Sequence, residues 1–187
     1  MKVTIVLGSI RKGRQSHKVA YFLQKKLTER AIETDLIDLA ETPLPIFGAN
    51  SQYSYSLEDN IIGIINRLQK ADALVLVTPE YHGSFSGVLK NALDHFWIEF
   101  GKKPIGVVTT YSGRMGGINA STQLQHVILS LGAYPLPLKF LVPHIQTAFD
   151  TSLIPLSDSI SSSADKFLDE FLWFAEAIAA KKKADGR

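Results

Sequence analysis

Hydrophobic positions along the chain alternate between the spacing of strands and the spacing of helices. A short apolar run at 2–8 predicts a buried strand, and apolar side chains that recur every three or four positions across 16–30 predict an amphipathic helix. The same alternation continues along the chain. It predicts further strands at 34–39, 73–77, 105–110 and 134–138, and further helices at 57–70, 86–100, 118–131 and 157–181.

Five strands that alternate with five helices indicate a single α/β domain over residues 1–187. Nearly pure apolar runs such as 73–77 are typical of parallel strands that are covered on both faces. Because a parallel crossover needs a covering helix, we predict three layers, with helices on both faces of a parallel sheet. Neither a repeat nor a linker divides the sequence.

The composition excludes several kinds of site and partner. The chain has no cysteine, which excludes disulfides, thiolate metal sites and cysteine nucleophiles. Its net charge is only +2 and its basic residues are scattered, so nucleic-acid binding has little support. The apolar run at the start is too short for a membrane span or a secretory signal. We therefore expect a cytoplasmic protein without nucleic-acid or membrane partners, and no metal site.

The loops after the first, third and fourth predicted strands have unusual compositions. In open parallel sheets, ligands bind outside the carboxyl ends of the strands, near the point where the strand order reverses. The three loops, at 8–16, 78–84 and 111–117, should therefore meet at one edge of the sheet. We expect the ligand site there.

The first loop has the features of an anion site. It leads into a helix, where backbone N–H groups are free, and it carries Ser9, Ser16, Arg11 and Arg14. Its glycines have P-loop spacing, but Arg14 and Gln15 replace the lysine and the hydroxyl of that motif, and GxGxxG is missing. A monophosphate fits best. The alternative is that Ser16 only caps the helix and the basic side chains are solvated.

The second and third loops suggest a pocket for a planar ring. Pro79 fixes one backbone dihedral, Gly83 permits positive φ, and Tyr81 offers an amphipathic ring, so this backbone can approach a flat ligand closely. The third loop carries three glycines and again leads into a helix. A plain turn and a flexible connection are the alternatives for the two loops.

Three segments together resemble the NADPH-dependent FMN reductase family. They are Gly8-Ser9-Ile10-Arg11 with Ser16, Thr78-Pro79-Glu80-Tyr81-His82-Gly83-Ser84, and Leu89-Lys90-Asn91-Ala92-Leu93-Asp94, and the similarity spans residues 2–140. The resemblance implies a flavodoxin-like three-layer sandwich with strand order 2-1-3-4-5. It also implies FMN as the bound cofactor and NADPH, or NADH, as cosubstrate.

The resemblance also implies roles for individual residues. Ser9, Arg11 and Ser16 would bind the FMN phosphate; Pro79, Glu80, Tyr81, His82 and Gly83 would line the flavin ring; Ser112, Gly113 and Gly117 would complete the site. His82 stands where many members have Asn, so its imidazole could touch the acceptor. Arg114 is the candidate for the 2′-phosphate of NADPH. No catalytic side chain is expected, because the flavin carries the chemistry.

The expected function is NAD(P)H-dependent reduction of the flavin, followed by reduction of a small acceptor in a ping-pong cycle. Free FMN, a quinone, an azo compound, a ferric complex and chromate all stay open as acceptors. A flavodoxin-type electron carrier is a rival, although such carriers tend to be strongly acidic. A non-catalytic FMN-binding module is another.

The helix at 86–100 is apolar over more of its circumference than packing on one sheet face requires. A homodimer or homotetramer is therefore expected. The alternative is that the excess packs under the loop at 41–56.

Overall fold

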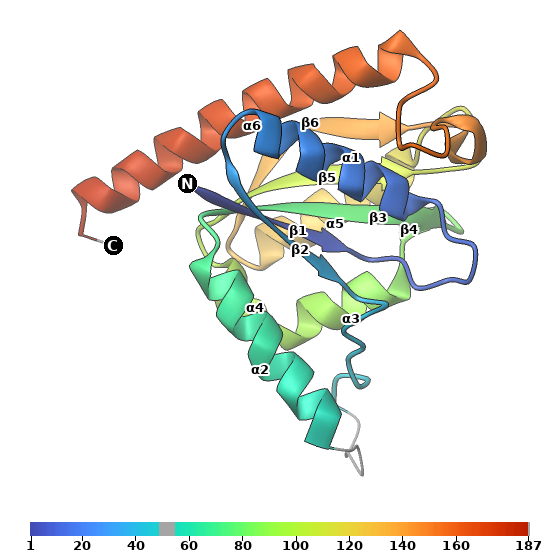
Figure 1. Cartoon of the computed structure of the whole chain (residues 1–187). Helices are drawn as coiled ribbons and strands as arrows, with labels where there is room; N and C mark the ends of the chain where they lie inside the picture. Colours follow the sequence, from blue (N-terminus) through green and yellow to red (C-terminus); the bar gives the residue numbers. More distant parts are fainter. Residues whose placement is uncertain (49–54, 187) are drawn as a thin grey trace.

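The computed structural model describes residues 1–48 and 55–186, in which strands and helices alternate (Figure 1). The strands are β1 (Lys2–Leu7), β2 (Glu33–Asp38), β3 (Ala73–Tyr81), β4 (Ser84–Phe85), β5 (Pro104–Thr110) and β6 (Tyr134–Val142). The helices are α1 (Ser16–Glu29), α2 (Tyr55–Lys70), α3 (Gly87–His95), α4 (Trp97–Phe100), α5 (Ile118–Ser130) and α6 (Asp158–Ala184), with the 3₁₀ turn η1 at Ile145–Thr147.

The main sheet is parallel and its strands lie in the order β2-β1-β3-β5-β6. This order is the 2-1-3-4-5 expected for the five predicted strands, so the predicted architecture is confirmed. The short strand β4 lies outside that path and pairs antiparallel with the end of β3.

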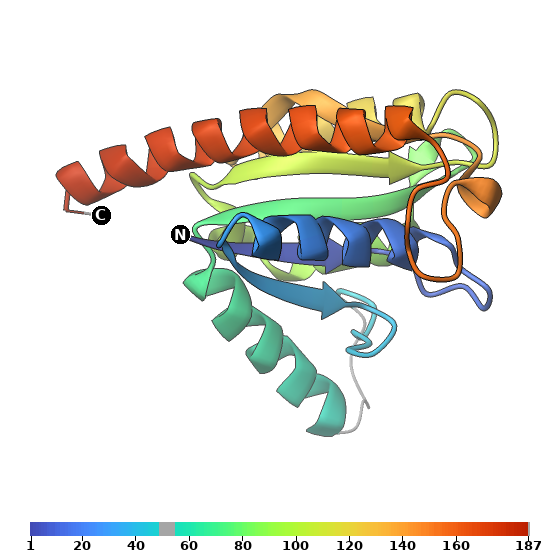
Figure 2. The ribbon, with the colours of Figure 1, turned by 45° about the horizontal axis from the view of Figure 1, so that its top comes forward.

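Two apolar cores lie on the two faces of the sheet. Helices α1 and α6 cover one face and lie side by side in Figure 2, whereas α2, α3 and α5 cover the other. The alternation of side chains along β1 shows why: Val3 and Leu7 pack under α1, and Val6 packs on the opposite face. Within the described ranges, no helix is long and apolar enough to cross a bilayer.

Strand β3 is longer than predicted. It was expected to end at residue 77, but it continues through Pro79 to Tyr81. Beyond Val77 it has lost its neighbour β1, whose last paired residue is Leu7. Thr78 and Pro79 pair only with β5, and the strand end at 80–81 pairs with β4. A proline is tolerated there because one side of the strand needs no N–H donor. The predicted second loop is therefore a strand end followed by a hairpin.

Two further boundaries differ from the sequence prediction. The prediction of a single helix at 86–100 is wrong, because the chain leaves helical geometry at Phe96 and forms two helices, α3 and α4. Strand β6 extends to Val142 instead of ending at 138. Its two prolines, Pro135 and Pro137, obscured the strand pattern, but they are compatible with an edge strand.

The described part of the loop after β2 is fastened to α3. Asn91 accepts a hydrogen bond from the Phe47 N–H at 2.9 Å and donates one to the Pro45 carbonyl at 2.7 Å. The rest of this loop, 49–54, lies outside the described residues. On α4, Trp97 and Ile98 stay 67% and 87% exposed, so the described segment leaves part of this apolar surface uncovered.

Candidate cofactor-binding site

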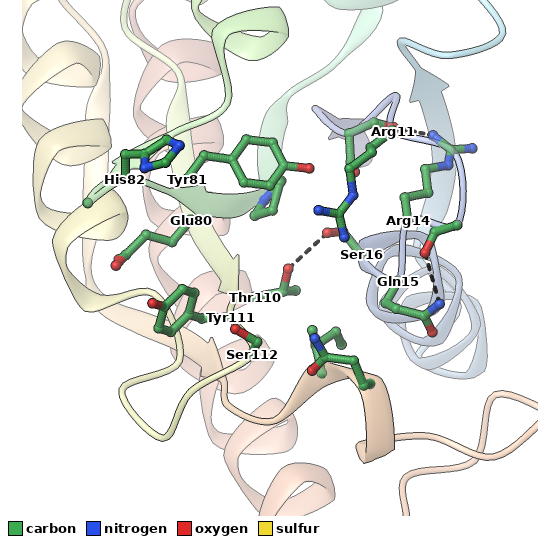
Figure 3. A pocket seen from close by; sticks show the side chains of 16 residues that line it. Arg11, Arg14, Gln15, Ser16, Glu80, Tyr81, His82, Thr110, Tyr111 and Ser112 are labelled. Carbon is green, nitrogen blue, oxygen red and sulfur yellow. Dashed lines mark hydrogen bonds between the residues drawn. The ribbon is translucent and has the colours of Figure 1, made fainter.

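The predicted loops meet in a cavity of about 460 Å³ at the carboxyl ends of the strands (Figure 3). Ligand cavities in proteins span roughly 300–1,000 Å³, so this one suits a cofactor-sized molecule. Its walls come from the first loop, the β3–β4 hairpin, the end of β5 and η1. The lining residues are Ser9, Arg11, Gly13, Arg14, Gln15, Ser16, Pro79, Glu80, Tyr81, His82, Gly83, Thr110, Tyr111, Ser112, Ile145 and Gln146.

The first loop begins at a close approach between β1 and α3. A Cβ atom on Gly8 would lie 2.6 Å from Cβ of Leu89, a distance that only glycine avoids. The carbonyl of Gly8 accepts a hydrogen bond from the Ser86 hydroxyl, which also caps α3 by accepting from the Leu89 N–H. The start of the first loop is thereby tied to the helix that follows the hairpin.

This loop presents donors that lack partners within the described residues. The Ser9 hydroxyl is buried and has no hydrogen-bond partner there. The Arg11 guanidinium is in none of the ion pairs of that part of the chain and lies 5.9 Å from the centre of the Tyr81 ring. Buried polar atoms without partners are rare, and one that faces a cavity suggests a missing ligand. An anion would satisfy both groups.

Ser16 does not cap α1, so the alternative in which it serves only as an N-cap is wrong. The N-cap residue is Gln15, whose side chain makes no capping hydrogen bond. The Ser16 hydroxyl instead lies 2.8 Å from the Thr110 hydroxyl at the end of β5. The first turn of α1 therefore faces the cavity without a side-chain cap, and its N–H groups favour an anion there.

Arg14 has a different environment from Arg11. Its guanidinium makes a bidentate ion pair with Asp38, the last residue of β2, and also donates to the Ser9 carbonyl. Hydrogen bonding to Asp38 raises the pKa of Arg14 above its ordinary value. The sequence suggested Arg14 as a second fork for phosphate, but in the structure both ends of that fork are engaged.

A tight hairpin forms the wall opposite the first loop. His82 and Gly83 have φ angles of 50° and 78°, which places both central residues of the two-residue turn in the left-handed region of a type I′ turn. The α5 side chain of Gln123 clamps this turn, donating to the Gly83 carbonyl and accepting from the Ser84 hydroxyl. Histidine tolerates positive φ better than most residues, as asparagine does.

Glu80 lines the cavity, but its carboxylate serves the neighbouring helix. Its Oε2 accepts a hydrogen bond at 3.0 Å from the N–H of Ala120 in the first turn of α5. The N-cap of that helix is Gly117, which has no side chain to cap with. Glu80 supplies the cap from β3, and the positive end of the helix dipole stabilises its charge.

The third loop contributes less to the cavity than the sequence implied. Ser112 lines it, whereas Gly113, Gly117 and Arg114 are not among the lining residues. A Cβ on Gly113 would lie 3.0 Å from the Tyr111 ring, and one on Gly117 would lie 2.8 Å from Thr109. These glycines let the loop pack, and the exposed side chain of Arg114 lies outside the cavity wall.

Several lining residues were given no role by the sequence interpretation: Gly13, Gln15, Thr110, Tyr111, Ile145 and Gln146. Thr110 and Tyr111 directly precede Ser112, so their place at a strand end was a signal that could have identified them. Ile145 and Gln146 belong to η1. No motif marked them, because only the fold of the chain after β6 brings them to the cavity.

The fold and the site define a flavodoxin-like domain with a cavity for a phosphorylated planar cofactor. The buried Ser9 hydroxyl, the Arg11 guanidinium, which is in no ion pair of the described residues, and the uncapped start of α1 fit a phosphate monoester. The strand end and hairpin at 79–83, with the Tyr81 ring, provide a wall that fits a planar ring. These residues therefore fit FMN.

Comparison with known proteins identifies the family. The sequence model of the NADPH-dependent FMN reductases matches residues 1–147, and the chain belongs to this family. It is similar to an FMN-dependent NADPH-azoreductase of Staphylococcus saprophyticus, with 32% identity over 188 residues that cover 94% of this chain and 96% of that protein. The match confirms the resemblance, and with it an oxidoreductase class that uses FMN and a nicotinamide nucleotide.

Solved structures agree on the fold. The flavoenzyme NAD(P)H:(acceptor) oxidoreductase FerB from Paracoccus denitrificans has a TM-score of 0.77 at 24% identity, covering 94% of this chain and 97% of that one. A flavodoxin from an archaeon has a TM-score of 0.62 at 10% identity, covering 96% and 99%. At these identities the likeness shows the flavodoxin-like fold.

Proposed function

We propose that this protein binds FMN in the cavity, accepts a hydride from NADPH, or NADH, and passes the electrons to a small acceptor in a ping-pong cycle. One observation supports this more than any other. The donors for a phosphate, which lack partners within the described residues, and the hairpin wall for a ring lie in the same cavity, on opposite sides of it (Figure 3). Bound FMN would supply the hydride chemistry at its ring.

The chain's own residues bind the cofactor and orient it. Ser9, Arg11 and the first turn of α1 hold the phosphate, which fixes the cofactor at one end. The strand end and hairpin at 79–83 lie along the ring, and Gln123 and Ser84 keep this wall in place. Ser112 contributes from the third loop. Gly113 and Gly117 shape that loop by packing on Tyr111 and Thr109.

The acceptor that we favour is a planar aromatic molecule, an azo compound or a quinone. The named activity of the staphylococcal relative supports this choice, as do Tyr81 and Tyr111, which both line the cavity and are each 36% exposed. Exposed aromatic rings favour flat partners. His82, at the corner of the hairpin, would contact the acceptor, and exposed Arg114 would meet the 2′-phosphate of NADPH.

A flavodoxin-type electron carrier and a non-catalytic FMN module are the alternatives. The net charge of +2 favours the enzyme over a carrier, because an anionic nucleotide is attracted to a near-neutral or basic protein more than to an acidic one. We further propose a homodimer or homotetramer that covers the exposed Trp97 and Ile98 of α4.

Titration with FMN, followed by an assay of NADPH oxidation with and without an azo dye or a quinone, tests the proposal. We expect a spectral shift on FMN binding, bleaching of the flavin by NADPH, and recovery of its colour when the acceptor is added. A failure to bind FMN at high micromolar concentration would overturn the proposal. FMN binding without bleaching by NADPH would favour the electron carrier or the non-catalytic module.

A further inference from the structure

The ion pair between Arg14 and Asp38 is the most enclosed one in the part of the chain that the structure describes. Two guanidinium nitrogens each lie 2.5 Å from a different carboxylate oxygen of Asp38. The side chains are 18% and 1% exposed. Asp38 also accepts a hydrogen bond from the Ala40 N–H at 3.0 Å, so the turn after β2 holds the carboxylate in place.

The same guanidinium fixes a peptide of the first loop. One of its nitrogens donates to the Ser9 carbonyl. In a trans peptide the carbonyl and the next N–H point in opposite directions, so the N–H of Ile10 points away from Arg14. Ser9 also carries the buried hydroxyl that lacks a partner, and it lines the cavity. Arg14 therefore sets the orientation of the residue that offers donors to the phosphate.

We propose that Arg14 and Asp38 are positioning residues that shape the phosphate-binding loop, and that Arg14 does not itself bind the phosphate. The inference rests on the proposed function, because it assumes that FMN occupies the cavity. Asp38 ends the strand next to β1, where it pairs in register with Leu7, directly before the loop. The pair thus anchors the loop to the neighbouring strand.

The charges around the cavity agree with this division of roles. Arg14 is neutralised by Asp38 and the Glu80 carboxylate is bound to the start of α5, so Arg11 is the remaining cation among the lining residues. A guanidinium with two nitrogens on a carboxylate cannot turn to a phosphate without leaving a buried carboxylate uncompensated, which is unfavourable.

A second ion pair provides a matched control. Arg67 of α2 makes a bidentate pair with Asp35 of the same strand, β2, at 2.7 and 2.9 Å, and it too donates to a backbone carbonyl, that of Leu36. Neither side chain lines the cavity. Substitutions of this pair should affect stability in a similar way but should leave the phosphate loop unchanged.

The decisive variants are Arg14→Gln and Asp38→Asn, measured for their affinity for FMN and for riboflavin, which lacks the phosphate. We expect both to weaken FMN binding roughly tenfold to a hundredfold, the size of a hydrogen bond to a charged group, with riboflavin nearly unchanged. The control variants Arg67→Gln and Asp35→Asn should bind both ligands like the wild type.

A double variant allows the same test if a single substitution unfolds the protein. Arg14→Met combined with Asp38→Leu leaves no unpaired buried charge, so it should fold. It should show the same loss of FMN affinity as each single variant, because both residues act through one contact with the loop.

Each other outcome overturns the inference. If Arg14 bound the phosphate directly, Asp38→Asn would free it and FMN would bind as tightly as before or more tightly. Equal losses of affinity for FMN and riboflavin, or the same loss of FMN affinity in the Arg67 and Asp35 controls, would mean that the Arg14–Asp38 pair only stabilises the fold in general. Absence of FMN binding by the wild type would overturn the proposed function and this inference with it, whereas normal FMN binding by every variant would overturn the inference alone.

Discussion

Replacing Arg11 with alanine tests the phosphate site most directly. Arg11 lines the cavity, is exposed, and is in no ion pair of the described residues, so its removal leaves no buried charge behind. Its guanidinium lies 5.9 Å from the centre of the Tyr81 ring. We therefore expect Arg11→Ala to fold normally and to weaken FMN.

The expected loss of FMN binding free energy follows from two opposing contributions. A hydrogen bond from a guanidinium to a phosphate contributes about 1.5–3 kcal/mol. To reach the phosphate, Arg11 must leave the Tyr81 ring, and an exposed cation–π contact contributes about 0.5–1 kcal/mol. The net loss on substitution is then about 1–2 kcal/mol, or roughly five- to thirtyfold in the dissociation constant of FMN.

Fluorescence titration of the apoprotein with FMN and with riboflavin measures this loss. Riboflavin should be bound weakly by both proteins and should not distinguish them. Lys12→Ala is the matched control, because Lys12 is an exposed cation of the same loop that does not line the cavity. If Arg11→Ala lowered the affinities for FMN and riboflavin equally, or if Lys12→Ala lowered FMN affinity as much, the phosphate would not lie against Arg11.

Four further predictions concern stability, the hairpin and assembly. Burial, and then the nearby charge of Lys182, lower the pKa of Lys103 to about 8, so the folded protein binds this proton more weakly than the unfolded chain. The free energy of unfolding should therefore rise as pH rises from about 8 toward the ordinary pKa of 10.5. Chemical denaturation at several pH values should show that Lys103→Met loses this rise. Gly106→Ala would place a Cβ 2.7 Å from Cζ of Phe167 and should cost about 1–3 kcal/mol in denaturant unfolding without weakening FMN; an unchanged midpoint would contradict this packing. His82→Asn should keep FMN affinity, because asparagine also tolerates positive φ, and a clear loss in titration would mean that the imidazole contacts the flavin. Light scattering should report a dimer or tetramer that Ile98→Glu converts to the 20.6 kDa chain, and a wild-type monomer would refute this assembly.

The sequence by itself determined the layers of the fold and the edge of the sheet where the site lies. Apolar runs at strand and helix spacing follow from which faces are buried, so they are visible without coordinates. The same holds for loops whose composition departs from ordinary turns. Ser9, Arg11, Ser16 and the segment 79–83, which the sequence proposed as cofactor contacts, all line the same cavity.

Only the tertiary structure decided how these residues are used. Arg11 and Arg14 look equivalent in the sequence, but Asp38 binds Arg14, whereas Arg11 is in no ion pair of the described residues. The Glu80 carboxylate likewise accepts a hydrogen bond from a helix start that lacks its own cap. The partners of these side chains depend on which polar groups from distant segments come into contact. Local patterns report burial and backbone conformation, whereas the pairing of charges and hydrogen bonds is settled only when the strands and helices have packed.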